Sequence, residues 1–159
     1  MVPNYYLKRM GGADKVAKFV AIAPSNHGTS VSGLSSLAES FRVLGLISVL
    51  YDIAGVPGLA QQVQGTAFQK ALWADGDTVP GPRYTVIETN RDRVVTPYTN
   101  AFLNGPNVRN ITVQDQCPAD PVPHIGMFVD GPVLQNVLNS LGPDDPAFRP
   151  TCTDFGPAI

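Results

Sequence analysis

The 159-residue chain has few charged residues, few cysteines and few histidines, and each shortage removes a class of function. Charged residues make up only 15 %, and 11 basic against 13 acidic residues leave a net charge of −2. This balance predicts no basic surface for nucleic acid or for an anionic membrane. With two histidines, two cysteines and no close group of carboxylates, we expect neither a metal site nor a cofactor.

The chain also lacks an uninterrupted apolar run of about 20 residues, which a membrane-spanning helix needs. The most apolar stretch, residues 43–60, contains Asp52 and is broken by Pro57 and by three glycines (Gly45, Gly55 and Gly58). The first six residues have neither the basic start nor the apolar core of a secretory signal. We therefore expect no transmembrane segment and no signal peptide in this sequence.

What the chain does contain is typical of one loop-rich globular domain, over residues 1–159. Its length suits a single domain, and a hydrophobic content of 43 % is enough for a sizeable core. Glycine and proline occur 15 times each, and the proline share is well above the usual value of about 5 %. We expect many turns, and a loop-rich, loose tail over residues 142–159.

Short apolar runs alternate with segments of helical character. Runs over residues 16–23, 84–88 and 108–114 predict strands, the first of them buried on both faces. Helices are expected over residues 5–10, 31–53, 61–73 and 131–141. The last has Pro132 near its start and five apolar residues that we place on one face (Val133, Leu134, Val137, Leu138 and Leu141). Strands separated by helices predict a mainly parallel sheet in an α/β fold.

Two polar residues follow the second and third predicted strands, at the sheet edge where α/β proteins bind ligands. Asp92 comes shortly after the second strand, and His124 follows the third by a longer loop. A carboxylate that orients a histidine is two-thirds of a nucleophilic triad, and α/β-hydrolases place the acid before the histidine in the chain. The alternative is a solvated aspartate between Arg91 and Arg93, with an unrelated loop histidine.

Three other residues allow two interpretations each. His27 follows the first strand and either lines a substrate pocket or caps its loop by hydrogen bonding. Cys117 and Cys152 are either two buried free thiols or one disulfide. A disulfide would close a loop of about 36 residues and stabilise the fold by roughly 3–4 kcal/mol.

Four segments of the chain resemble secreted class 2 lipases of actinobacteria, whose architecture also occurs in the yeast lipase B type of the α/β-hydrolase superfamily. Two segments surround the Asp/His pair: YTVIETNRDRVVTPY (residues 84–98) and NVRNITVQDQCPADPVPHIGM (residues 107–127). MVPNYYLKRMGGADKVAKFVAIAPSNHGT (residues 1–29) resembles the stretch after the family's nucleophile. QQVQGTAFQKALWADGDTVPG (residues 61–81) resembles the segment before the strand that leads to the acid.

This resemblance implies a triacylglycerol lipase or carboxylesterase with Asp92 as triad acid and His124 as triad base. It also implies that Cys117 and Cys152 form a disulfide, that the family's members are secreted, and that no cofactor is needed. In such lipases a helical cap covers the site. Residues 31–73 match that cap, in which Leu44 and Ile47 are candidates for the acyl pocket, although a core role is equally compatible with them.

The nucleophile of this family lies in a Gly-x-Ser-x-Gly turn, and no such pentapeptide occurs in the chain. We therefore expect a partial α/β-hydrolase fold that supplies the acid and the base for ester hydrolysis but not the serine, and that is inactive alone. Its partners would be a lipid or ester substrate and either the missing N-terminal half or a second copy at an exposed sheet edge. The alternative is a non-catalytic module that binds a lipid or a partner protein.

Overall fold

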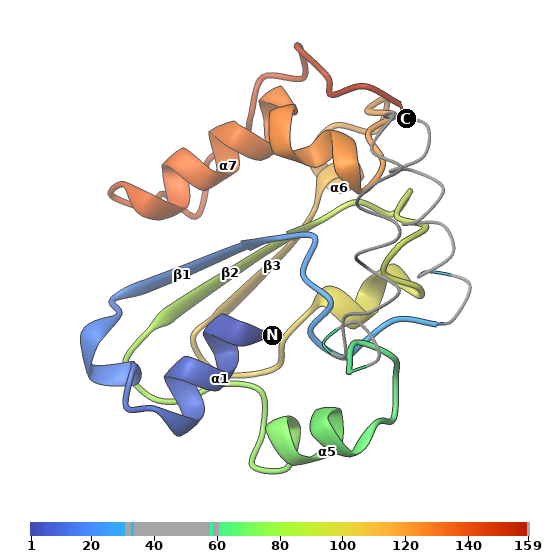
Figure 1. Ribbon diagram of the computed structural model, residues 1–159. Helices are drawn as coiled ribbons and strands as arrows, with labels where there is room; N and C mark the ends of the chain where they lie inside the picture. The colour runs from blue at the N-terminus through green and yellow to red at the C-terminus, as the bar shows by residue number, and fades with distance from the viewer. Residues whose placement is uncertain (31–32, 34–57, 59–60, 159) are drawn as a thin grey trace.

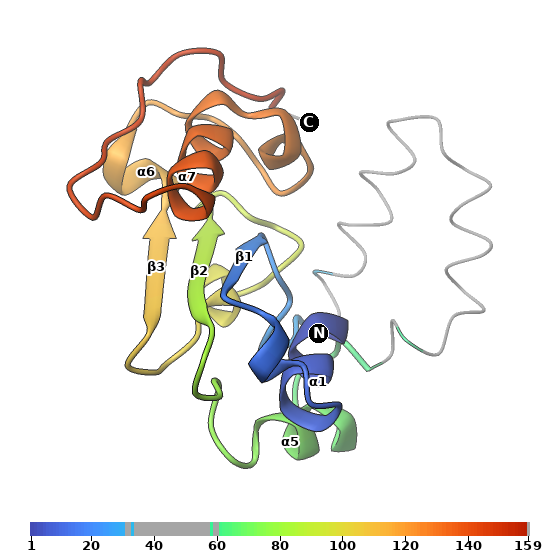
Figure 2. The ribbon, with the colours of Figure 1, turned by 90° about the vertical axis from the view of Figure 1, so that its left-hand side faces the viewer.

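The computed structural model describes residues 1–30, 33, 58 and 61–158. Within these residues, three strands form a parallel sheet in the order β1-β2-β3: β1 (Lys18–Ile22), β2 (Arg83–Glu88) and β3 (Val108–Thr112). The strands run in one direction, so their carboxyl ends meet at one edge (Figure 2). This arrangement confirms the α/β fold class.

Helices cover both faces of the sheet (Figure 1). On one face lies α7 (Gly131–Leu141), and on the other lie α1 (Val2–Arg9), α5 (Ala67–Trp73) and the 3-10 turn η2 (Tyr98–Ala101). Short turns complete the order: η1 (Ala13–Lys15), α6 (Val113–Gln116) and η3 (Ile125–Val129). A separate apolar cluster fills each side, one around Ile87, Ile111 and Val133, the other around Tyr84, Val86 and Leu103. Alternate residues of β2 thus enter opposite cores.

The first strand differs from the expectation that both of its faces are buried. All five residues of β1 are half-buried, whereas every residue of β2 after Arg83 is buried. The reason is position, because β2 pairs with a strand on each side and β1 pairs only with β2 among the residues described. The apolar run therefore predicted strand β1 correctly, but its prediction that both faces of β1 are buried is wrong.

Local sequence accounts for where the helices begin. Asp130 caps α7, since its Oδ1 accepts a hydrogen bond from the Val133 backbone N–H at 2.9 Å, and Pro132 lies in the first turn. Thr66 caps α5 through a 3.4 Å bond from the Gln69 N–H. Both devices satisfy backbone donors that a helix start leaves without partners.

The five apolar residues of α7 do not all pack against the core. Val133 is buried and Val137 packs against the same core, but Leu134, Leu138 and Leu141 are 42 %, 71 % and 55 % exposed. Two polar residues, Asn136 and Ser140, are buried in their place. The helix therefore presents a row of leucines outward.

The segment after α7 consists of loops and turns that are docked on the protein. Cys152 is joined to Cys117 with a Cα–Cα distance of 5.5 Å, which confirms the disulfide. Gly156 is buried and donates its N–H to Asp130 Oδ2 at 2.9 Å. In the described part of the chain, no helix has the length and apolar character needed to cross a membrane.

Candidate functional site

The two residues that follow β2 and β3 meet in space. His124 Nδ1 lies 2.6 Å from Asp92 Oδ2, and their side chains are 15 % and 0 % exposed respectively. No described residue forms a hydrogen bond with the other ring nitrogen, Nε2. Asp92 thus fixes one ring nitrogen as a proton donor, which leaves the other as the acceptor of a neutral imidazole.

The carboxylate of Asp92 is held by the backbone that follows it. Its Oδ1 accepts hydrogen bonds from the N–H groups of Val94 and Val95, at 2.6 and 2.9 Å. Its own N–H donates to Thr89 O at 3.2 Å, which closes the turn between β2 and the aspartate. With Oδ1 occupied by two backbone donors, Oδ2 is aimed at His124.

A buried glutamine ties the Asp92 turn to the loop that carries His124. Gln114, in α6 directly after β3, accepts a hydrogen bond from the Asn90 N–H at 2.9 Å. Its amide nitrogen donates to Thr89 Oγ1 at 2.9 Å and to Asp120 O at 3.2 Å. One side chain therefore connects the turn before Asp92 to the start of the His124 loop.

The two arginines beside Asp92 are exposed, whereas Asp92 itself is buried, so the alternative of a solvated aspartate does not hold. Arg91 uses its Nε to donate to Asp120 O at 2.9 Å, which adds a second connection between the two loops. Arg93 is exposed and has no hydrogen bond or ion pair to another described residue. The backbone and His124 supply the hydrogen bonds of Asp92, and the guanidinium groups supply none.

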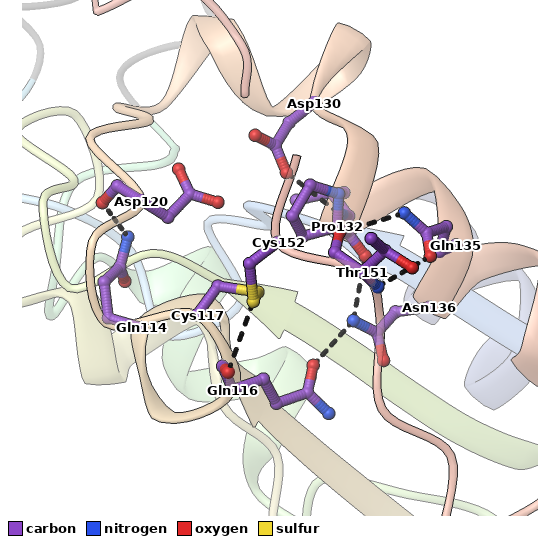
Figure 3. The surroundings of a disulfide bond; sticks show 11 residues. Gln114, Gln116, Cys117, Asp120, Asp130, Pro132, Gln135, Asn136, Thr151 and Cys152 are labelled. Atoms are coloured by element: carbon purple, nitrogen blue, oxygen red, sulfur yellow. Dashed lines mark hydrogen bonds between the residues drawn. A yellow bond between two sulfur atoms is a disulfide. The ribbon is translucent and has the colours of Figure 1, made fainter. Parts of the chain in front are cut away.

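The far end of the His124 loop is fixed by the chain's last residues. A Cβ on Gly126 would lie 2.5 Å from Pro157 O, so only glycine allows this close approach. Gly131 donates its N–H to Asp154 O at 2.8 Å. Figure 3 shows the disulfide of Cys152 in the same neighbourhood as Asp120 and Asp130. Residues 152–157 thereby fix the position of the loop that carries His124.

Two buried carboxyl groups near the pair have an oxygen without a partner in the described structure: Glu88 Oε2 and Asp120 Oδ2. Burial, followed by the charge of Asp92, raises the pKa of Glu88 well above its usual range. Burial and the nearby Asp130 raise the pKa of Asp120 as well. Both groups therefore favour the protonated form more than an exposed carboxyl does.

His27 is placed in a different hydrogen-bonded group. Its Nε2 lies 3.1 Å from Asp77 Oδ2, and its ring lies 5.0 Å from that of Trp73 at the end of α5. Burial opposes ionisation of Asp77, but hydrogen bonds from His27 and Asn104 lower its pKa overall. These contacts favour the loop-capping alternative, and a pocket role for His27 stays a prediction.

The remaining predicted residues do not add to the pair. Leu44 and Ile47 lie outside the described residues. Ser25 Oγ donates to Gln62 at 2.7 Å, and Ser30 Oγ bonds Thr96 Oγ1 and accepts from the Gly33 N–H. Across residues 1–30 and 61–158, no three His, Cys, Asp or Glu side chains are grouped as a metal site.

Three residues around the pair were not predicted from the sequence: Gln114, which connects the two loops, and the buried carboxyl groups of Glu88 and Asp120. Glu88 ends a strand and Asp120 lies in a loop, where a carboxyl group usually points to solvent. The available signal was position, since Glu88 belongs to an apolar run that we had assigned to a buried strand. A charged residue inside such a run indicates either that the strand is wrongly assigned or that the charged side chain has a specific role in the interior.

A parallel sheet with helices on both faces and an aspartate–histidine pair beyond its carboxyl edge defines a partial α/β fold of the lipase type. The solved structure of Aspergillus fumigatus lipase B has this fold: it matches with a TM-score of 0.67 and 23 % identity over 91 % of the chain. The chain spans 35 % of the length of that lipase.

Sequence similarity does not assign the chain to a family. No protein-family model matches the chain, and no curated protein matches it. The similarity to the lipase at this level of identity shows the fold, and the finer resemblance to actinobacterial class 2 lipases has no support from sequence relatives.

Proposed function

We propose that the chain contributes the acid and the base of a Ser-Asp-His triad to a lipase or carboxylic ester hydrolase that acts on acylglycerols. The observation that carries this proposal is the 2.6 Å contact between His124 Nδ1 and Asp92 Oδ2. Its position after adjacent parallel strands, in a fold like that of a lipase, supports the assignment.

In this reaction His124 acts through Nε2. The nitrogen takes the proton of the serine hydroxyl as its oxygen attacks the ester carbonyl, and then gives that proton to the leaving alcohol. Water repeats the sequence on the acyl-enzyme, which releases the fatty acid and restores the serine. Asp92 orients the ring and stabilises the imidazolium formed in each half of the reaction.

The proposal assigns the serine to a segment other than this chain. Ser25 and Ser30 hold structural hydrogen bonds, and the sequence contains no Gly-x-Ser-x-Gly turn. Removing the nucleophile of a triad lowers the rate by orders of magnitude, and each lost oxyanion donor costs about 10²–10³-fold more. The chain alone is expected to be close to inactive. The disulfide is compatible with a secreted enzyme.

The experiment combines a fluorophosphonate probe with nuclear magnetic resonance of the histidine rings. We expect no adduct by intact mass, and a strongly deshielded His124 Nδ1 proton that disappears in Asp92→Asn. His27→Gln is the matched control, because it removes the other histidine and leaves this signal in place. An adduct that His124→Ala abolishes would show that the chain has its own serine. A His124 ring without a bound Nδ1 proton would contradict the triad.

A further inference from the structure

Glu88, the last residue of β2, has its carboxyl group in the interior of the protein. The residue is 0 % exposed and shares a strand face with Tyr84 and Val86, which belong to an apolar cluster. Its Oε1 accepts the N–H of the next residue, Thr89, at 2.8 Å. The other oxygen, Oε2, is buried and receives a hydrogen bond from no described donor. A buried carboxylate oxygen without a donor is costly.

The carboxylate of Asp92 is the charged group that acts on Glu88. Neighbouring strands bring no other charge to this level of the sheet, since Glu88 pairs with Thr112 on β3 and Ile87 pairs with Ile22 on β1. Two adjacent buried carboxyl groups cannot both ionise without strong repulsion. This repulsion favours a single negative charge on the two groups.

The hydrogen bonds decide which group keeps it. Asp92 has three donors, which are two backbone N–H groups and His124 Nδ1, and all three stabilise its charged form. Glu88 has one donor. The hydrogen bonds therefore favour the proton on Glu88, in agreement with its raised pKa.

We propose that Glu88 is a positioning residue, which holds a proton on Oε2 and donates it to the carboxylate of Asp92. The bond would orient Asp92 toward His124 and keep a single negative charge beside the imidazole. The catalytic role of Glu88 rests on the proposed triad. The proton on Glu88 and the hydrogen bond to Asp92 do not depend on that proposal. Because Glu88 acts through Asp92, it would not touch the substrate.

Two substitutions separate this role from simple packing. Glu88→Gln keeps a neutral donor at the same position, and Glu88→Leu keeps a similar volume without a donor. Thr85→Val, at another buried position of β2, is the control for loss of a polar group in this strand. All variants would be measured in the full chain, with the disulfide intact.

The first readout is the carbon resonance of the Glu88 carboxyl group in the wild-type chain. We expect the protonated form at neutral pH. The second is exchange of the His124 Nδ1 proton with water, which we expect to change less than twofold in Glu88→Gln and Thr85→Val but to increase at least tenfold in Glu88→Leu.

An ionised Glu88 at neutral pH would overturn the proposal by itself, whether or not any variant folds. Exchange that is equally slow in Glu88→Leu would also overturn it. A wild-type chain that lacks the protected His124 proton would overturn the proposed triad instead, and the Glu88 carboxyl resonance would still decide the protonation of that residue.

Discussion

Asp120 and Asp130 are two fully buried carboxyl groups that lie on either side of His124 in the chain and interact with each other. Asp130 accepts two backbone hydrogen bonds, one on each oxygen, from Val133 and from Gly156. Asp120 accepts one, from Val122 at 2.9 Å, and its Oδ2 has no described partner. Asp130 thus has one hydrogen-bond donor more than Asp120, and burial together with the charge of Asp130 raises the pKa of Asp120.

The stability of the chain should therefore fall as the pH rises above about 4. The pKa values of Glu88 and Asp120 are raised in the folded state above their usual values of 4.5 and 3.8. A group with a raised folded pKa binds its proton more tightly in the folded state, so its contribution is complete below the unfolded pKa. That contribution is lost as the pH rises through the folded pKa.

Urea unfolding at a series of pH values measures this effect. The free energy of unfolding should decrease from mildly acidic toward neutral pH, and Asp120→Asn should reduce the slope. Asp14→Asn, at an exposed aspartate, is the control and should leave the slope unchanged. At still lower pH the lowered pKa of Asp77 works in the opposite direction, because its contribution is lost as the pH falls below about 3.8. A free energy that rises steadily toward neutral pH would contradict the assignment.

Reduction of the Cys117–Cys152 bond should destabilise the chain by roughly 3–4 kcal/mol, because the bond closes a long loop in the unfolded state. The double variant Cys117→Ser, Cys152→Ser should show the same loss without reductant. Chemical unfolding with and without reductant provides the measurement, and the double variant should not respond to reductant. Equal stability of the oxidised and reduced chains would mean that the tail is held by Asp130 and its glycine contacts alone.

Much of this fold can be predicted from short-range sequence patterns. Most of the hydrogen bonds that position the site join residues far apart in the sequence and cannot be predicted in this way. The strands end within a few residues of their apolar runs, and Asp130 with Pro132 defines the start of α7. The short helix α6 was missed because Val113 continues the apolar pattern of β3 and no glycine or proline separates the two.

The exposure of the leucines on α7 could not be predicted from the sequence for a related reason. Leu134, Leu138 and Leu141 are spaced as a helical stripe, and periodicity shows that a stripe exists without showing what covers it. The pair of Asp92 and His124 could be predicted because chain order places both beyond one sheet edge. The role of Gln114 could not be predicted, because its side chain bonds Asn90 and Thr89, which are 24 and 25 residues away in the sequence.

Loss of the Gln114 side chain should loosen the connection between the two loops of the site. Gln114→Leu removes the three side-chain hydrogen bonds of Gln114: the Asn90 N–H loses its partner, and Asp120 O keeps only its bond from Arg91. We expect a cost of about 1–3 kcal/mol. We expect this loss in urea unfolding, together with faster hydrogen exchange at the Asn90 amide. Gln64→Leu is the control, because this exposed glutamine makes one long bond of 3.4 Å. Unchanged exchange at Asn90 would show that the bonds from Thr89 to Val122 and from Arg91 to Asp120 are enough to join the loops.

The exposed leucines of α7 should promote self-association of the chain. Leu138 is 71 % exposed, and Phe128 and Val129 expose more than half of their surface in the turn before the helix. Exposed apolar surface of this kind favours contacts between molecules. Sedimentation velocity should show a larger average species as concentration rises, and Leu138→Glu should reduce it. Val2→Glu adds the same charge at an 82 % exposed residue of α1, where it should have little effect. A chain that stays monomeric, or that responds equally to both substitutions, would exclude α7 as the contact surface.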